Sequence, residues 1–363
     1  MKVTFPHMGS LSIALEGLLT DLGLEIVIPP PITKKTINLG VLNAPEFACF
    51  PLKITLGNFI EGLEAGADTV VMLGGTGPCR LGYYAEVQKE ILRDLGYDFE
   101  MIVLEPPQGK VTDLTDELKK LCGTTSWAQM MRALHTVWRK VKALDKLHAL
   151  SLQVRAREVE LHATTKAYQK SIALLREAQT PAAVNQKLRQ GLAILKAVPQ
   201  DRQKSVLRLG LVGEIYMLLE PFANLEVEKI LGEMGVEVER SLYISEWMKE
   251  HLLLSSMRLK GGLAVKRAAE AYLNNTVGGH GWESIGATVR YARRGYDGVI
   301  HILPFTCTPE IVAQSILPTV SKEQGIPVLS FSLDEQSGEA GFKTRLEAFL
   351  DLLEQRKKTW SRV

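Results

Sequence analysis

The chain has 363 residues, of which 46% are hydrophobic and 23% are charged, and its formal net charge is +2. That length favours two α/β domains, with or without a helical insertion, over one small core. The charge leaves no basic excess for nucleic acid, and no stretch of about 18 residues is apolar enough to span a bilayer. Residues 1–19 lack the charged start and unbroken apolar run of a signal peptide, so we expect a cytoplasmic protein.

Short apolar runs alternate with amphipathic segments over residues 1–110. The predicted strands cover 2–5, 25–29, 67–75 and 99–107, and the predicted helices cover 11–23, 58–66 and 83–96. The stretch 45–53, which reads PEFACFPLK, has no clear helical or strand pattern. Strand, helix and strand repeated at this spacing predict a doubly wound parallel sheet.

Residues 111–205 differ because β-branched runs give way to long charged helices, which predicts a helical subdomain. Residues 206–363 return to the α/β pattern. Strands are predicted at 208–216, 236–244, 297–305 and 326–333, helices at 224–235, 285–295, 310–325 and 341–357, and a loop at 277–284. The predicted fold is therefore two doubly wound domains with a helical subdomain between them, and the cleft between the domains is the expected place for a site.

The sequence has four cysteines, and three of them share one context. Cys79 ends GGTGPC directly after an apolar strand, Cys307 follows another strand in PFTCTPE, and Cys49 stands in a loop just ahead of a helix. The fourth, Cys122, falls in the last turn of a charged helix, where a small buried thiol is the ordinary explanation. Because cytoplasmic thiols stay reduced, we interpret these residues as core groups, ligands or nucleophiles rather than as disulfides.

A single loop cysteine is as often a small buried hydrophobe as a ligand, but three in the same context favour a metal site. Zinc would want a fourth cysteine or histidine and close CxxC pairs, which the sequence lacks. An iron–sulfur cluster accepts ligands from distant segments, and three cysteines leave one iron for another ligand or a substrate. The GGTGPC glycines do not fit a nucleotide-binding motif, and Gly77 more simply lets the turn approach a cluster.

Six stretches together resemble the family of 2-hydroxyacyl-CoA dehydratase subunits, which also includes benzoyl-CoA reductase subunits and double-cubane cluster proteins. These stretches are FPHMG (5–9), PEFACFPLK (45–53), GGTGPCRLGYY (74–84), GGHGWESIG (278–286), LPFTCTPE (303–310) and DEQSGEAGFKTRLEAF (334–349). The resemblance covers roughly 1–110 and 206–355, and the chain looks most similar to the activase-related branch.

The resemblance implies two flavodoxin-like domains with an iron–sulfur cluster held between them by Cys49, Cys79 and Cys307. It implies anaerobic chemistry on an acyl-CoA or another small molecule, and a partner activase that hydrolyses ATP and delivers electrons at low potential from its own cluster. With four cysteines in all, a single [4Fe–4S] cluster is the simpler expectation. A double-cubane [8Fe–9S] cluster is the alternative, with ligands shared in a homodimer or with a related subunit.

Several neighbours of these cysteines are further candidates, each with an ordinary competing explanation. Arg80 could donate to a sulfide or hold an acyl-CoA carbonyl or phosphate, although a surface ion pair would explain it equally. His280 lies between glycines and could act as an acid or base or as the fourth ligand. A histidine that packs the loop or caps the helix competes with that role, since Ser284 can cap the following helix.

Two more residues, Glu46 and Lys53, lie close enough to Cys49 in the chain to support its ligand geometry, although either can simply face water. His7 follows the first strand and is expected at the same edge of the sheet.

Three functions follow from these patterns. The first is an enzyme component that uses low-potential electrons in reductive chemistry. The second is an electron-transfer or cluster-holding protein without a substrate of its own. The third is a binding protein stabilised by zinc, which iron and zinc analysis separates from the other two.

Overall fold

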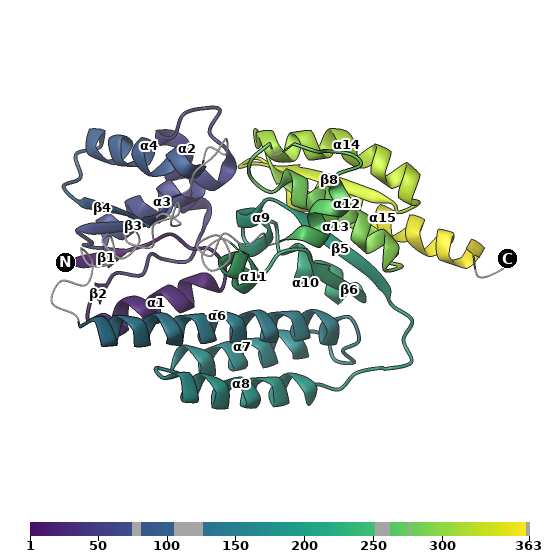
Figure 1. The fold of residues 1–363 in the computed structure, drawn as a ribbon, viewed down its shortest axis with the longest axis horizontal. Coiled ribbons are helices and arrows are strands. Elements are labelled where there is room, and N and C mark those ends of the chain that lie inside the picture. Colours follow the sequence, from purple (N-terminus) through teal and green to yellow (C-terminus); the bar gives the residue numbers. More distant parts are fainter. Residues whose placement is uncertain (75–80, 105–125, 251–261, 276, 361–363) are drawn as a thin grey trace. The chain divides into compact units, whose positions relative to one another are not determined.

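The computed structural model describes residues 1–74, 81–104, 126–250, 262–275 and 277–360. The chain divides into two compact units, each built around one four-stranded parallel sheet (Figure 1). The first unit comprises Met1–Leu144, Leu175–Lys187 and Ile244–Gly262, and the second comprises Asp145–Leu174, Leu188–Tyr243 and Leu263–Val363. The expected α/β fold with two parallel sheets is thereby confirmed.

The sheet of the first unit has the strand order β2-β1-β3-β4. Its strands are β1 (Lys2–Thr4), β2 (Glu25–Ile26), β3 (Thr69–Leu73) and β4 (Glu100–Leu104). Its main helices are α1 (Leu11–Asp21), α2 (Lys34–Asn43), α3 (Phe50–Glu64) and α4 (Leu81–Asp94), and the short α11 (Ile244–Met248) also belongs to this unit. In Figure 1, α2, α3 and α4 lie on one side of the sheet and α1 lies on the other.

Helix α3 is the centre of this unit, because its residues are buried on every side from Phe50 to Leu63. Close approach of α2 makes this burial complete. A Cβ at Gly40 would lie 1.8 Å from the carbonyl oxygen of Lys53, and a Cβ at Gly57 would lie 2.0 Å from that of Thr36. Only glycine allows two backbones to pack so closely.

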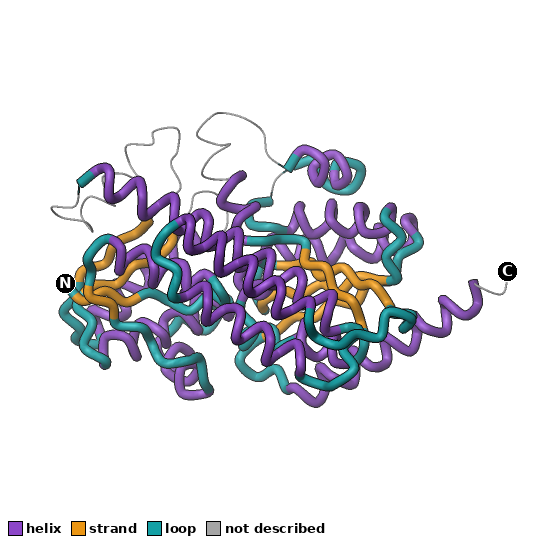
Figure 2. Tube along the Cα trace, turned by 90° about the horizontal axis from the view of Figure 1, so that it is seen from below, coloured by secondary structure: helices purple, strands orange, loops and turns teal. Residues whose placement is uncertain are grey.

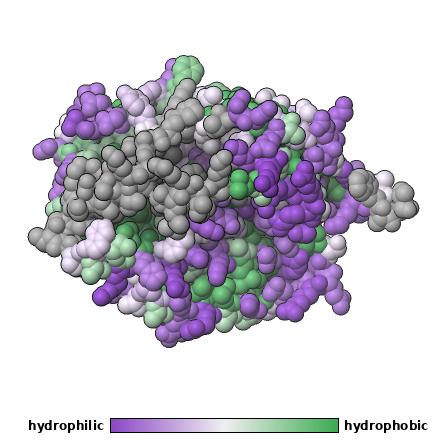
Figure 3. Space-filling model, in the orientation of Figure 1, coloured by the Kyte–Doolittle hydropathy of each residue, from purple (hydrophilic) through white to green (hydrophobic). Residues whose placement is uncertain are grey.

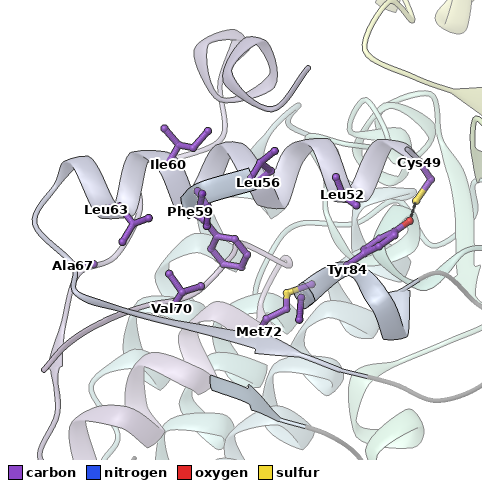
Figure 4. Close-up of a cluster of buried hydrophobic side chains, with 12 residues drawn as sticks. Cys49, Leu52, Leu56, Phe59, Ile60, Leu63, Ala67, Val70, Met72 and Tyr84 are labelled. Atoms are coloured by element: carbon purple, nitrogen blue, oxygen red, sulfur yellow. Dashed lines mark hydrogen bonds between the residues drawn. The ribbon is translucent and has the colours of Figure 1, made fainter. Parts of the chain in front are cut away.

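The opposite side of α3 contributes to a hydrophobic cluster with β3 and α4 (Figure 4). The cluster includes Leu52, Leu56, Phe59, Leu63, Val70, Met72 and Tyr84. Burial of such apolar side chains, at roughly 25 cal/mol per Å², is the main force that fixes α3 against the sheet. The start of α3 is thereby held rigidly at the carboxyl edge of that sheet.

The sheet of the second unit has the order β6-β5-β7-β8, which repeats the order of the first sheet strand for strand. Its strands are β5 (Leu207–Gly213), β6 (Val236–Arg240), β7 (Gly298–Pro304) and β8 (Val328–Leu333). Its helices include α9 (Ile215–Leu219), α10 (Val227–Glu233), α12 (Leu263–Ala269), α13 (Gly281–Arg293), α14 (Thr308–Gln324) and α15 (Glu339–Trp360). The two halves are therefore structural repeats.

Helices cover both faces of the second sheet, where the strands form the inner layer (Figure 2). A Cβ at Gly298 would lie 3.0 Å from the side chain of Leu353 on α15, and a Cβ at Gly210 would lie 2.3 Å from Tyr291 on α13. Gly298 pairs with Leu209, the neighbour of Gly210, so the two glycines face opposite sides of the sheet. Helices α13 and α15 thus pack on opposite faces.

Helix α15 shows how these outer helices are patterned. Its buried side chains recur at helical spacing, and they are Phe342, Leu346, Phe349, Leu350 and Leu353. The residues between them are mostly exposed and many are charged. Hydrophilic side chains accordingly cover much of the visible face where α14 and α15 lie (Figure 3).

Three long helices form the middle of the chain, as expected: α6 (Trp127–Arg155), α7 (Ala163–Arg176) and α8 (Pro181–Lys196). Division of the chain into two units cuts through each of them.

In the second unit, α6 supplies His148 to a buried ionic group with Glu228 on α10 and Arg240 on β6. Arg240 donates to Glu228 at 2.9 Å and 2.5 Å, and His148 Nε2 lies 3.0 Å from Glu228 Oε2. Burial alone would raise the pKa of Glu228, but Arg240 and His148 hold that pKa well below its ordinary value.

Some predicted boundaries were wrong for identifiable reasons. Helix α2 was not expected, and α3 begins at Phe50, well before the predicted start at 58, because a proline in the first turn of a helix does not break it. The predicted loop 277–284 contains the start of α13 at Gly281. Ser284 therefore lies inside the helix and does not cap it.

Among the helices that the structure describes, none has the length and apolarity that crossing a membrane requires.

Candidate metal centre

In each sheet, the first and third strands in chain order are neighbours: β1 and β3 in the first sheet, β5 and β7 in the second. The strand order reverses between these two neighbours. Ligands of doubly wound folds bind at the carboxyl ends of these two strands. In the first unit this edge follows β1 and β3, and in the second it follows β5 and β7. Cys79, Gly77 and Arg80 follow β3 in the sequence and lie outside the described residues, as does Cys122.

Cys49 is the N-cap residue of α3, with an extended backbone and a proline in the first turn of the helix. Its side chain is buried at the end of the hydrophobic cluster, where Sγ contacts the hydroxyl of Tyr84 (Figure 4). Tyr84 lies in the first turns of α4, which begins at Leu81, directly after the GGTGPCR stretch. Burial alone would fit a small core residue, but the polar contact and the N-cap position also suit a ligand.

The other candidates of the first unit differ in their surroundings. Glu46 is exposed, whereas Lys53 is buried in α3, where its carbonyl oxygen faces Gly40. His7 follows β1, as expected, and its Nε2 lies 2.9 Å from the carbonyl oxygen of Pro29. A carbonyl only accepts, so Nε2 carries the proton there, and this nitrogen is not positioned to bind a metal.

Cys307 is the N-cap residue of α14 and follows β7 closely. Its backbone N–H donates to the carbonyl of Pro304 at 3.1 Å, and its side chain is buried. The preceding residue, Thr306, has a φ of 69°. Left-handed backbone is unfavourable for a β-branched residue and costs of order 1–3 kcal/mol, so the surrounding structure must enforce this turn. Such strain concentrates at functional sites.

His280 is the N-cap residue of α13, but its side chain makes no capping hydrogen bond. The next residue brings α13 against α14: a Cβ at Gly281 would lie 2.1 Å from the carbonyl oxygen of Pro309. The structure thus brings the helix starts that carry His280 and Cys307 into contact within the second unit. Helix N-termini carry the positive ends of the helix dipoles, which favour thiolates and other anions.

A buried polar group beside this edge escaped the sequence analysis. His301 on β7 and Glu310 on α14 are fully buried, with Nε2 of the histidine 2.9 Å from Oε2 of the glutamate. Ser284 on α13 donates to the same Oε2 at 2.9 Å, and His301 Nδ1 lies 3.1 Å from Ser330 Oγ on β8. The one signal in the sequence was a histidine inside the apolar strand VIHILPF.

Glu214 lies at the same edge, directly after β5. Its carboxylate caps α9 by accepting a hydrogen bond from the N–H of Met217 at 3.1 Å. Burial, together with the negative charge of Glu310, raises the pKa of Glu214 to about 7 against the lowering effect of hydrogen bonds from the Tyr216 and Met217 backbone. A carboxyl with this pKa is partly protonated at neutral pH, which is unusual and typical of functional sites.

The donor set suits a thiolate-bound metal centre. Cys49 and Cys307 are both thiols at helix N-termini, and such sulfurs are the ligands of iron–sulfur clusters and of structural zinc. No group of three or more ligand side chains occurs within the described ranges, which do not include Cys79.

Fold and edges together define a two-unit α/β protein with a buried cysteine thiol at the carboxyl edge of each parallel sheet. The model of the family described as 2-hydroxyglutaryl-CoA dehydratase, D-component, matches residues 33–353. The chain belongs to this family, and the resemblance to the 2-hydroxyacyl-CoA dehydratase superfamily is confirmed. No curated protein matches the chain.

Proposed function

We propose that this chain is the cluster-bearing component of a reductive system related to the 2-hydroxyacyl-CoA dehydratases. Cys49, Cys79 and Cys307 hold one [4Fe–4S] cluster, and a separate activase supplies electrons at the expense of ATP. The observation that supports this most strongly is the shared position of Cys49 and Cys307. Each is the N-cap of a helix at the carboxyl edge of a parallel sheet.

Membership of the family adds the cofactor and the partner to this proposal. Proteins of this family depend on iron–sulfur chemistry and generally act with a separate activase component. When bound, such a cluster accepts and passes on one electron at low potential. The residues of the chain provide thiolates, exclude water and set the local charge.

Individual residues have distinct roles in the proposal. The Tyr84 hydroxyl contacts Cys49 Sγ, and hydrogen bonds to ligand sulfur tune the potential. His280 holds or moves a proton beside Cys307, because their helices begin in contact. Arg80, the residue after Cys79, binds the carbonyl or phosphate of an acyl-CoA. Gly77 lets the chain approach the cluster, and Lys53 supports the first turn of α3 behind Cys49.

Anaerobic purification followed by iron, sulfide and zinc analysis and EPR tests the cofactor. We expect about four irons and four sulfides per chain, with an EPR signal after reduction by a strong chemical reductant. About eight irons per chain would replace the [4Fe–4S] cluster with a double cubane. Zinc without iron would contradict the proposal and indicate a zinc-stabilised binding protein.

A second experiment tests the source of the electrons. The iron-loaded chain is mixed anaerobically with an activase of this family and a reductant, with ATP and separately without it. Cluster reduction that requires ATP supports the proposal. Equal reduction in both mixtures would indicate an electron-transfer protein that needs no activase.

A further inference from the structure

Glu214, Glu310 and His301, together called the proton site, lie at or beside the edge where the strand order of the second sheet reverses. Glu214 follows β5, and its backbone N–H donates to the carbonyl of Ile302 on β7 at 3.2 Å. His301, the neighbour of Ile302 on the same strand, contacts Glu310 at 2.9 Å. Glu310 lies in the first turn of α14, the helix that Cys307 caps. The proton site and the proposed ligand therefore share one edge.

The charges of the proton site do not balance by themselves. Glu310 contacts the His301 imidazole, Glu214 accepts from the Met217 N–H, and no lysine or arginine of the described residues forms an ion pair with any of the three. Packed around them, α13 contributes the Ser284 hydroxyl, β8 the Ser330 hydroxyl and α9 the phenol of Tyr216, whose pKa burial raises well above its ordinary value. Full ionisation of both carboxyls would leave an uncompensated negative charge away from water, which is unfavourable.

The two carboxyls differ in access and in hydrogen bonding. Glu310 is fully buried, and its Oε1 has no hydrogen-bond partner among the residues that the structure describes. Glu214 is half-buried, so it is the more accessible of the two carboxyls. Its pKa of about 7 makes it the group whose protonation changes most readily at neutral pH.

We propose that the proton site takes up one proton from water when one electron is delivered to the metal centre at Cys307. The electron comes from a low-potential one-electron donor, and the proton forms an O–H bond on the Glu214 carboxylate. One negative and one positive charge enter together, so the net charge of the unit does not change. This inference rests on the proposed function, because it requires a redox group at Cys307.

The direction of this coupling follows from electrostatics. A negative charge added nearby raises the pKa of a carboxyl, and this effect is strong where water is scarce. Reduction therefore raises the pKa of Glu214 from about 7 to a higher value. Between these two pKa values each electron brings one proton. Glu310 acts through its negative charge on Glu214, as a positioning residue rather than a catalytic one.

The test is a redox titration of the EPR signal of the iron-loaded chain between about pH 6 and pH 9. In the unmodified chain, the midpoint potential should fall above about pH 7 by about 59 mV for each tenfold drop in proton concentration. Glu214→Gln should abolish this dependence, while the glutamine oxygen can still cap α9. Glu310→Gln should move its onset to lower pH, because one negative charge is lost.

A matched control and a cluster-independent measurement make the test decisive. Glu220→Gln changes a buried carboxyl of the same unit outside the proton site and should leave the potential profile unchanged. Infrared spectra of the metal-free chain should show a protonated carboxyl band that disappears as the pH rises through about 7 and is missing in Glu214→Gln.

Failure of the inference and failure of the proposed function look different. An iron–sulfur signal whose potential depends on pH equally with and without Glu214 overturns the inference and leaves the proposed function standing. Absence of the infrared band in the unmodified chain also overturns the inference. A chain that binds no iron overturns both, even if the carboxyl band is present.

Discussion

Substitution of Gly281 by alanine tests whether the helix starts that carry His280 and Cys307 are in contact. The added Cβ would lie 2.1 Å from the carbonyl oxygen of Pro309, 2.7 Å from its carbonyl carbon and 3.4 Å from its Cα. All three are backbone atoms, which cannot turn aside as a flexible side chain can. Helices α13 and α14 must therefore separate where they begin.

The expected size of the effect follows from two opposing contributions. Overpacking of this kind costs about 1–3 kcal/mol. Alanine at a helix interior gains up to about 1 kcal/mol over glycine, and less in the first turn. The free energy of unfolding should therefore fall by about 1–2 kcal/mol in Gly281→Ala.

Gly341→Ala is the matched control, because it makes the same change in helix α15 of the same unit. A Cβ at Gly341 would meet no atom of the other described residues within 4 Å beyond its own stretch of helix, so stability should be unchanged or increase by up to about 1 kcal/mol. Urea unfolding curves with equal m-values measure both differences. If Gly281→Ala were as stable as Gly341→Ala, α13 and α14 would not begin in contact, and the link between His280 and Cys307 would be lost.

Three further predictions concern stability. Because the pKa of Glu214 is raised from 4.5 to about 7, its protonated form stabilises the fold at low pH, and this stabilisation, at most about 3 kcal/mol, is lost as the pH rises through about 7. Glu214→Gln should remove that loss, and urea midpoints with parallel pH profiles in the two proteins would contradict the raised pKa. Arg240→Met should lower the free energy of unfolding by about 3–5 kcal/mol, because Glu228 stays buried without its main cation, and adding Glu228→Gln should restore part of it; a loss under about 1 kcal/mol would refute this. Gly40→Ala should destabilise the first unit, because its Cβ would lie 1.8 Å from the Lys53 carbonyl oxygen, and a thermal midpoint equal to that of the unmodified chain would show that α2 and α3 are not so close.

Much of the fold could be predicted because several of its strands, such as β3, β5 and β7, are apolar runs that end at or next to glycine or proline. The starts of helices were harder to predict at proline and glycine, because each of these residue types occurs both in loops and in the first turn of a helix. The stretch 45–53, which contains Pro51, showed no clear helical pattern, although proline is favoured in the first turn of a helix and α3 begins at Phe50. Gly281 indicated a loop, although its missing side chain serves close packing against Pro309.

The candidate site could be predicted only in part. Cys49 and Cys307 were accessible to sequence reasoning, because residues that follow an apolar strand or precede a helix reach the edge of a parallel sheet. The contact of Glu310 with His301 and with Ser284 was not, because the partners are 9 and 26 residues apart on separate elements. Such contacts depend on which helix packs against each face of β7. Tertiary packing decides this, and the sequence pattern of a single element does not show it.

The central claim is that three cysteines bind one metal centre, and the most direct measurement is the iron content of single cysteine variants after anaerobic reconstitution. Cys49→Ser, Cys79→Ser and Cys307→Ser should each lose most of the bound iron and the EPR signal. Cys122→Ser should keep both. Full iron content and an unchanged signal in any of the first three variants would contradict the proposed ligand set.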